Sequence, residues 1–139
     1  MASLNLEIIT PSKSVFTGEI KSITIPGTSG SFQVLANHAP LISTFEIGEI
    51  KIEDVQSRKL SYSTAGGTVE ISNNKVLVLA DSLELVDNID IQRALNSKER
   101  AENRLANKSV ENIDVARAEA SLARAINRIK LSEKYSAVK

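Results

Sequence analysis

The sequence predicts an α+β protein with an N-terminal β-sandwich or barrel and a C-terminal helical part. Residues 1–86 contain nine or ten short runs in which apolar and polar residues alternate, with Gly, Pro and Asn between the runs. Residues 87–139 contain neither Gly nor Pro and are rich in Ala, Arg and charged residues. A chain of 139 residues is long enough for one β core and one helical appendage.

Each strand of the N-terminal part is predicted from its alternating pattern. The expected strands are residues 4–9, 19–25, 31–35, 41–45, 49–52, 58–64, 68–71, 75–79 and 83–86. Gly48 separates the fourth strand from the fifth. Gly66-Gly67 and Asn73-Asn74 predict hairpin turns, because both residues of a tight hairpin turn favour positive φ. Short strands at this spacing are typical of a sandwich or barrel.

The C-terminal part predicts two helices. The first runs from Asp90 to about Leu105, with Asp87 or Asn88 as its N-cap, and the polar segment 107–112 supplies caps for the second. The second helix carries a narrow apolar stripe of Val115, Ala118, Leu122, Ala125 and Ile129. Alanine buries little area, and burial is worth about 0.8 kcal/mol per methylene, so we expect weak helix–helix packing that permits rearrangement.

The composition excludes several classes of protein. The chain has no Cys, which excludes disulfides, thiolate metal sites and cysteine nucleophiles, and its only histidine is His38. A single histidine excludes a multi-histidine metal site. The N-terminus lacks the basic and apolar regions of a signal peptide, and no apolar run approaches the ~20 residues of a membrane span, so neither export nor membrane insertion is expected.

The two parts carry opposite charge. Residues 1–88 contain 6 Lys and Arg against 10 Asp and Glu, whereas residues 89–139 contain 11 against 7. The basic tail indicates an acidic partner surface, a phosphate-bearing ligand or nucleic acid. Nucleic acid is disfavoured, because Tyr135 is the only aromatic residue of the tail and carboxylates alternate with its cations.

Arginines recur at the same spacing, i, i+7 and i+11, in both predicted helices. They are Arg93, Arg100 and Arg104 in the first helix, and Arg117, Arg124 and Arg128 in the second. If the helices fold against each other, up to six guanidinium groups converge and favour binding of a phosphate or an acidic peptide. The alternative is a solvated basic face, offset by Glu119 and Glu133.

Two segments with possible catalytic chemistry are better explained as structure. The glycine-rich segment 27–32 lacks the Lys-Ser/Thr ending of a phosphate loop and leads into a strand, so a loop of the β domain is favoured. His38 has no accompanying Ser or Cys nucleophile motif, which favours a structural loop histidine. The residues therefore predict no enzymatic activity.

Five segments in the same order resemble one known family, the epsilon subunit of bacterial F-type ATP synthase. They are Leu-Glu-Ile-Ile-Thr-Pro at 6–11, Phe-Gln-Val-Leu-Ala-Asn-His-Ala-Pro-Leu at 32–41, Gly-Gly-Thr-Val-Glu at 66–70, Lys-Val-Leu-Val-Leu-Ala-Asp at 75–81, and Ile-Asp-Ile-Gln-Arg-Ala at 89–94. The resemblance covers nearly the whole chain. It implies a flattened ten-stranded β-sandwich in residues 1–86 and an antiparallel two-helix hairpin in residues 87–139.

The resemblance also implies a function. The chain would be a non-catalytic rotor subunit of the central stalk, peripheral to the cytoplasmic face of the bacterial cell membrane. Its sandwich would bind the gamma subunit and contact the ring of c subunits, coupling proton translocation to ATP synthesis. Its helices would inhibit ATP hydrolysis by engaging the beta and alpha subunits of the catalytic head. A free-standing nucleotide-sensing module is the alternative.

Family members whose isolated subunit binds ATP carry a motif similar to residues 89–94. Carried over by position, this motif implies an ATP site formed by Glu84, Ile89, Asp90, Arg93, Arg100, Arg124 and Arg128. ATP would be a regulatory ligand, with or without Mg²⁺, and no cofactor would be obligatory. The implied inhibitory contacts to the catalytic head are Arg117, Arg124, Arg128, Lys130 and Lys134, and the implied stalk interface is His38, Pro40 and Leu41.

Overall fold

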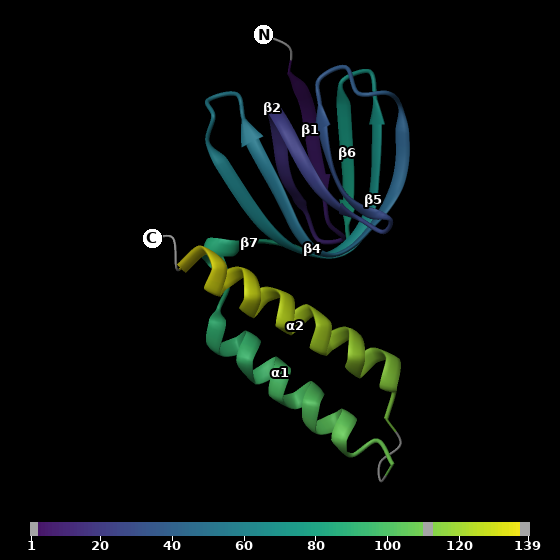
Figure 1. The fold of residues 1–139 in the computed structure, drawn as a ribbon, viewed down its shortest axis with the longest axis vertical. Helices are drawn as coiled ribbons and strands as arrows, with labels where there is room; N and C mark the ends of the chain where they lie inside the picture. Colours follow the sequence, from purple (N-terminus) through teal and green to yellow (C-terminus); the bar gives the residue numbers. More distant parts are fainter. Residues whose placement is uncertain (1–2, 110–112, 137–139) are drawn as a thin grey trace. The chain divides into compact units, whose positions relative to one another are not determined.

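In a computed structural model the chain forms two compact units, and the boundary between them along the sequence lies between Leu85 and Val86 (Figure 1). The structure describes residues 3–109 and 113–136. The first unit contains β1 (Leu4–Ile9), β2 (Ser14–Gly27), β3 (Gly30–Leu35), β4 (Leu41–Asp54), β5 (Lys59–Ser72), β6 (Lys75–Ala80) and β7 (Leu83–Leu85). The second contains the 3₁₀ turn η1 (Val86–Asn88), α1 (Ile91–Ala106) and α2 (Val115–Ser136). None of the helices in the described ranges has the length and apolarity needed to cross a membrane.

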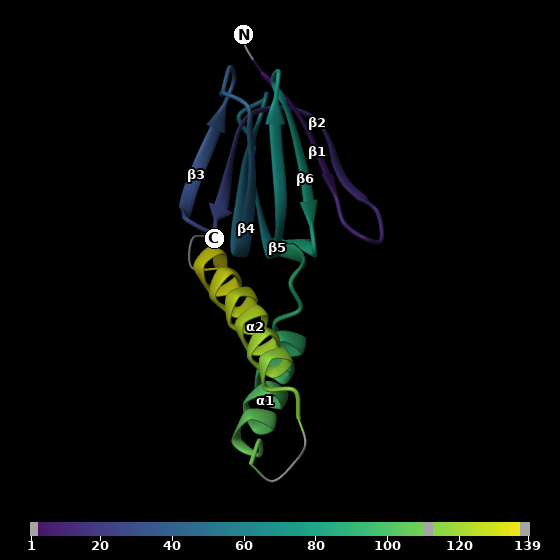
Figure 2. The same cartoon turned by 90° about the vertical axis from the view of Figure 1, so that its right-hand side faces the viewer.

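The strands of the first unit form one flattened sheet that closes on itself (Figure 2). Their order is β1-β6-β5-β4-β2-β3, with β7 paired to β5 and with β1 also paired to β2. The β1–β6 pair is parallel and the other pairs are antiparallel. The predicted fold class, a β-sandwich followed by two helices, is confirmed.

The predicted count of nine or ten strands is wrong for the described residues, which contain seven. β2, β4 and β5 are 14 residues long, and each spans a region where two short strands or a strand and a loop were expected. β5, for example, pairs with β7 through residues 62–64 and with β6 through residues 67–72. Gly48 lies inside β4 and does not end a strand.

The predicted hairpin turn at Gly66-Gly67 is also wrong, because both glycines lie inside β5. Their φ angles are 107° and 157°, and a Cβ on Gly67 would lie 2.0 Å from the carbonyl oxygen of Leu79. Paired glycines mark backbone that other residues rarely adopt, and a bend within a strand requires such backbone as much as a turn does. The other predicted turn is confirmed: Asn73 and Asn74 join β5 to β6 with φ of 51° and 60°.

The core of the first unit lies inside the closed sheet. Along β1, Leu4, Leu6 and Ile8 are buried while Asn5 and Glu7 are exposed, which is the alternation of a strand with one buried face. β2 to β6 contribute further Ile, Val, Phe and Tyr side chains to the same cluster. Full burial of each large aliphatic side chain contributes roughly 1.5–3 kcal/mol, so this unit has a substantial core of its own.

The two helices lie side by side and antiparallel in both views (Figures 1 and 2). Their helical character is confirmed, but the predicted caps are wrong. Asp90 caps α1 by accepting a hydrogen bond from the backbone N of Arg93 at 3.1 Å, and Asp114 caps α2 through the backbone N of Arg117 at 3.0 Å. Asp87 and Asn88 instead belong to η1. Of the polar segment 107–112, Asn107 ends α1, and residues 110–112 lie outside the described residues.

Alanines are the most deeply buried residues shared by the two helices. Ala94 and Ala101 in α1, and Ala118 and Ala125 in α2, are each at most 3% exposed. Val115, Leu122 and Ile129 of the predicted stripe are only partly buried. Alanine methyl groups are small and bury little area. They therefore fill only part of the space between the described helices, and a pocket remains there.

Candidate functional site

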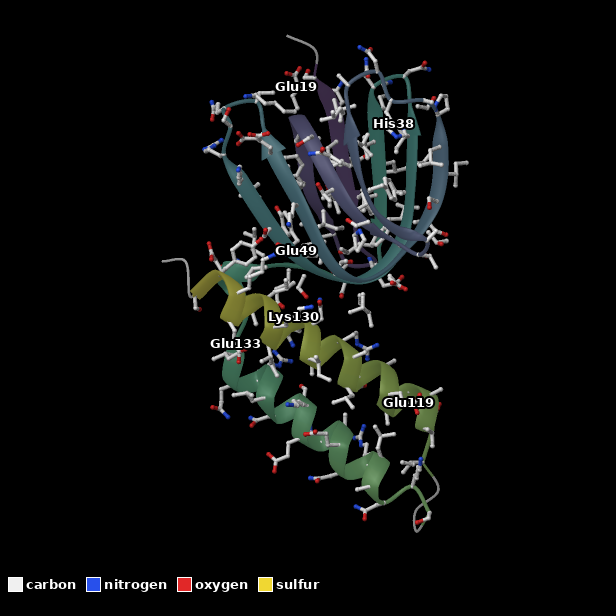
Figure 3. All side chains as sticks on the ribbon, viewed as in Figure 1. Glu19, His38, Glu49, Glu119, Lys130 and Glu133 are labelled. Atoms are coloured by element: carbon white, nitrogen blue, oxygen red, sulfur yellow. The ribbon has the colours of Figure 1, made fainter. Side chains whose placement is uncertain are left out.

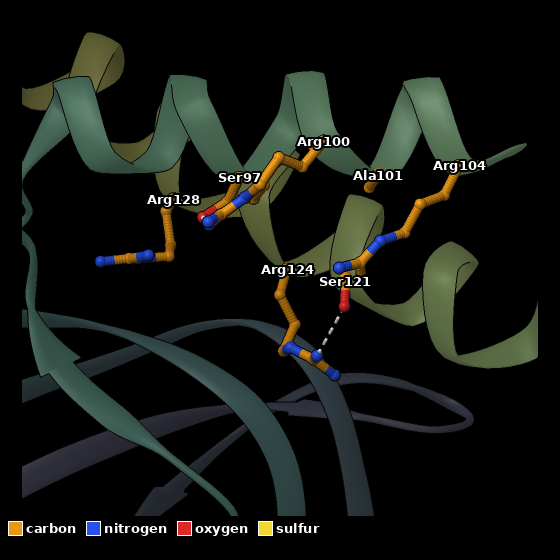
Figure 4. A pocket seen from close by; sticks show the side chains of 8 residues that line it. Ser97, Arg100, Ala101, Arg104, Ser121, Arg124 and Arg128 are labelled. Atoms are coloured by element: carbon orange, nitrogen blue, oxygen red, sulfur yellow. Dashed lines mark hydrogen bonds between the residues drawn. The ribbon is translucent and has the colours of Figure 1, made fainter. Parts of the chain in front are cut away.

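A pocket of about 350 Å³ lies between α1 and α2 (Figure 4). It is lined by two serines, two alanines and four arginines: Ser97, Arg100, Ala101 and Arg104 from α1, and Ser121, Arg124, Ala125 and Arg128 from α2. Small-molecule sites range from roughly 300 to 1,000 Å³, so this volume suits a small ligand. The expected convergence of arginines from the two helices is thus present for four of the six side chains.

The arginines are held in part by the neighbouring serines. Arg100 donates a hydrogen bond to Oγ of Ser97 at 3.2 Å, and Arg124 donates one to Oγ of Ser121 at 3.1 Å. Each contact joins residues one helical turn apart, which restricts the long arginine side chain. The remaining guanidinium N–H groups of a restricted arginine can then bind an anion with a smaller loss of side-chain entropy.

The described residues that line this pocket include no carboxylate. Glu119 and Glu133, which could have offset a solvated basic face, lie on α2 but not among the lining residues (Figure 3). Four guanidinium groups around one small pocket concentrate positive charge there and favour an anionic ligand. Phosphate groups fit this chemistry best, since guanidinium binds phosphate oxygens in a bidentate manner.

Only part of the predicted ATP-binding set lines the pocket. Arg100, Arg124 and Arg128 do, whereas Ile89, Asp90 and Arg93 do not. The carboxylate of Asp90 is engaged as the N-cap of α1. Glu84 lies on β7, in the other compact unit. The nucleotide site remains a prediction, and its arginine part is the part that the pocket supports.

Arg104 lines the pocket although the family resemblance did not assign it to the ATP site. Its signal was present in the sequence, because Arg104 belongs to the i, i+7, i+11 series of α1. Ser97 and Ser121 were missed altogether. A serine that precedes an arginine by three residues on a helix is the pattern that could have found them.

The predicted inhibitory contacts share α2 but differ in their surroundings. Arg124 and Arg128 line the pocket, whereas Arg117 and Lys130 are exposed outside it. Lys130 is marked on α2 in Figure 3. The ammonium group of Lys134 lies 5.2 Å from the ring centroid of Tyr135. The predicted contacts with a catalytic head stay a prediction.

The predicted stalk interface is an ordered loop with exposed apolar neighbours. His38 and Pro40 lie between β3 and β4, with His38 marked in Figure 3. The loop is tied to the β5–β6 turn, because Asn37 donates its backbone N–H to Oδ1 of Asn74 at 2.6 Å. Next to it are the exposed side chains of Leu41 at the start of β4 and of two residues that the sequence did not single out, Leu35 (54%) and Ile42 (77%).

Both units match models of one family. Residues 3–86 match the β-sandwich domain of the ATP synthase delta/epsilon chain, and residues 87–133 match the long α-helix domain of the same chain. Among curated relatives, the ATP synthase epsilon chain of Dehalococcoides mccartyi is 41% identical over 134 residues, covering 96% of this chain and 95% of the relative. That of Desulfitobacterium hafniense is 44% identical over 106 residues, covering 76% of this chain and 80% of the relative.

Solved structures agree on the fold. A chain in the mitochondrial ATP synthase of Euglena gracilis, in a structure of its OSCP, F1 and c-ring, aligns with a TM-score of 0.79 at 18% identity. The match covers all of this chain and 83% of the other. A chain in the central stalk and c-ring of Tetrahymena thermophila ATP synthase aligns with a TM-score of 0.59 at 13% identity, covering 95% of each.

These matches define the class first: the protein is a subunit of an ATP synthase rather than a free-standing enzyme. Within that class, the chain belongs to the delta/epsilon chain family, and its curated relatives are epsilon chains. The predicted family is confirmed, and so is the predicted place of this chain as a subunit of the ATP synthase complex.

Proposed function

We propose that this chain regulates its ATP synthase by binding ATP in the pocket between α1 and α2. The observation that carries the proposal is the convergence of Arg100, Arg104, Arg124 and Arg128 from two helices around one small pocket. A triphosphate would neutralise these guanidinium groups and bridge the helices. Ligand that binds only the folded hairpin stabilises it by RT ln(1 + [L]/Kd), about 2.7 kcal/mol at a hundredfold excess over Kd.

Regulation follows from the double use of α2. Arg124 and Arg128 belong both to the pocket and to the proposed contacts with the beta and alpha subunits of the catalytic head. The same guanidinium group cannot bind ATP phosphates and an acidic partner at once, so the two states compete. High ATP would hold the hairpin folded, and low ATP would release the basic tail to engage the head and stop ATP hydrolysis. Because mainly alanine side chains are buried between the helices, separating them requires little free energy.

The β unit would supply the coupling role. We infer that the loop with His38, Pro40 and Leu41, together with exposed Leu35 and Ile42, contacts the gamma subunit or the c-ring. An ordered loop with adjacent exposed apolar side chains is typical of a protein interface. The chain would then be peripheral to the cytoplasmic face of a bacterial membrane through the complex, with residues 1–86 and 87–139 as its coupling and regulatory domains.

Titration calorimetry of the isolated chain with ATP tests the nucleotide part. Saturable heat is expected with the native chain, and Arg128→Ala should weaken binding about tenfold to hundredfold, the value of a charge-assisted hydrogen bond of roughly 1.5–3 kcal/mol. Lys108→Ala removes one charge from the turn that follows α1, outside the pocket, and is the matched control. Absence of heat at millimolar ATP contradicts the proposal. Arg93→Ala tests whether Arg93 takes part in ATP binding, because the family resemblance assigns Arg93 to the ATP site but Arg93 does not line the pocket.

The alternative, a free-standing nucleotide sensor, makes a different prediction about assembly. A stalk subunit co-purifies with gamma and with membrane-bound ATPase activity, whereas a sensor does neither. Replacing Ile42 by Asp places a charge in the exposed apolar loop region, where Ile42 is 77% exposed and so contributes little to folding. Loss of gamma co-purification with an unchanged far-UV spectrum supports the stalk interface, and undiminished co-purification argues against this surface.

A further inference from the structure

The two helices repeat one sequence. Residues 89–104 and 113–128 align without gaps at an offset of 24 positions. The shared residues are Ile89 and Ile113, Asp90 and Asp114, Arg93 and Arg117, Ala94 and Ala118, Ser97 and Ser121, Arg100 and Arg124, Ala101 and Ala125, Asn103 and Asn127, and Arg104 and Arg128. Identical residues therefore occupy more than half of the aligned positions. The hairpin therefore carries an internal sequence repeat, with one copy in each helix and the residues just before it.

The repeat extends to the contacts. The capping bond from the backbone N of Arg93 to Asp90 is repeated by that from Arg117 to Asp114, at 3.1 and 3.0 Å. The guanidinium bonds from Arg100 to Ser97 and from Arg124 to Ser121 correspond in the same way, at 3.2 and 3.1 Å. Equivalent residues thus play equivalent structural parts in the two helices.

The pocket is built from this repeat alone. Every residue that lines it has its counterpart 24 positions away on the opposite helix, which is also a lining residue. Because α1 and α2 are antiparallel (Figures 1 and 2), equal helices are related by an approximate two-fold axis, which passes through the pocket near Ala101 and Ala125. The four lining arginines form two pairs at equivalent positions of the repeat, Arg100 with Arg124 and Arg104 with Arg128.

Such a site suits a ligand that is itself two-fold symmetric and anionic at both ends. Condensed inorganic phosphates have this form: diphosphate and linear triphosphate are symmetric about their centre, and their oxygens accept bidentate guanidinium bonds. A nucleoside at one end has no counterpart at the other. The described lining residues also include no aromatic ring on which a base could stack, and their only apolar groups are alanine methyls.

We propose that the pocket recognises the condensed phosphate chain itself, through the duplicated arginine pairs Arg100 with Arg124 and Arg104 with Arg128. Inorganic triphosphate and diphosphate are therefore ligands of this chain, and ATP binds chiefly through its triphosphate. This proposal rests on the same pocket as the proposed ATP response. It names condensed phosphate as the chemical class of ligand that the pocket selects.

Calorimetry of the isolated chain tests this directly, with inorganic triphosphate, diphosphate, orthophosphate, ATP and adenosine at matched ionic strength and in excess EDTA. Triphosphate is expected to bind within about tenfold of ATP, and adenosine to give no saturable heat. Arg100→Gln and Arg124→Gln should each weaken triphosphate binding by similar factors, about tenfold to hundredfold, because they are equivalent by the two-fold axis. Lys98→Gln, the same charge loss on α1 outside the pocket, should leave the affinity unchanged within about threefold.

Each outcome separates the two ideas. Binding of ATP without binding of triphosphate overturns the inference and leaves the proposed ATP response standing. Binding of triphosphate without binding of ATP supports recognition of the phosphate chain but contradicts binding of ATP through its triphosphate, and it removes the proposed ATP response. Absence of saturable heat from both ligands contradicts both proposals. If Arg100→Gln and Arg124→Gln differ strongly in their effect on triphosphate while both variants keep native helicity, the two-fold mode of recognition is wrong.

Discussion

At the scale of single residues, Gly67 is the backbone position in β5 that tolerates least change. Its φ is 157°, and a Cβ would lie 2.0 Å from the carbonyl oxygen of Leu79 and 2.9 Å from the ring of Phe45. Gly67→Ala is therefore expected to lower the free energy of unfolding by about 1–3 kcal/mol or more, the usual cost of overpacking. Thermal unfolding followed by circular dichroism measures the loss. Gly18→Ala is the control, since its new Cβ would find only an ordinary 3.6 Å contact with Phe16.

Asp54 is a carboxylate of the β unit whose pKa is shifted by burial and by its hydrogen bonds. Burial raises its pKa, but hydrogen bonds from the backbone N and Nε of Arg58 and from the backbone N of Gln56 outweigh burial and hold the pKa below its ordinary value of 3.8. A carboxyl group with a lowered pKa stabilises the fold at pH above that ordinary value, and the contribution is lost as pH falls through the lowered pKa. Asp54→Asn should therefore lower the melting temperature at pH 7, and the difference from the native chain should shrink as the pH falls through the lowered pKa of Asp54. A difference that stays constant over this pH range would show that the charge is not the cause.

At the scale of elements, mutations of the two capping aspartates, Asp90 and Asp114, can distinguish a role in helix capping from a role in ligand binding. Asp90→Ala and Asp114→Ala each remove the acceptor for one backbone N–H and should cost about 1 kcal/mol of helix stability. Asp90→Ser keeps an N-cap and removes the carboxylate, so helicity should be retained. If Asp90 acts only as a cap, ATP affinity of Asp90→Ser should equal that of the native chain. A large loss of affinity with native helicity would place Asp90 at the ligand.

The element scale also shows what local pattern could predict. Alternation located every strand because it records which side chain faces the core, as Leu4, Leu6 and Ile8 do in β1. Strand ends were less well predicted, because Gly48 and Gly66-Gly67 signal special backbone without saying whether the chain turns or only bends. The i, i+7, i+11 spacing located the arginine face of each helix. Which arginines line one pocket depends on how the helices pair, so Arg93 was expected there and Arg104 was not assigned.

At the scale of the whole molecule, mutations can separate the two parts of the proposed competition between ATP and the catalytic head for α2. Arg124 lines the pocket and is a proposed head contact, whereas Lys134 is a proposed head contact outside the pocket. In the reconstituted ATP synthase, Arg124→Gln should weaken both ATP binding and the inhibition of ATP hydrolysis. Lys134→Gln should weaken inhibition of ATP hydrolysis and leave the ATP affinity of the isolated chain unchanged. Hydrolysis rates measured over a range of ATP concentrations give the strength of inhibition, and calorimetry of the isolated chain gives its ATP affinity.

The dependence of inhibition on ATP follows from the same competition. If ATP holds the hairpin folded, inhibition should fall as ATP rises through the Kd of the pocket, and a variant with tenfold weaker binding should need tenfold more ATP for the same relief. Arg104→Gln suits this experiment, because Arg104 lines the pocket and lies on α1, outside the proposed head contacts of α2. A shift of the relief curve to higher ATP, with full inhibition retained at low ATP, is the expected result. An unshifted curve would mean that occupancy of this pocket does not control the release of the helices.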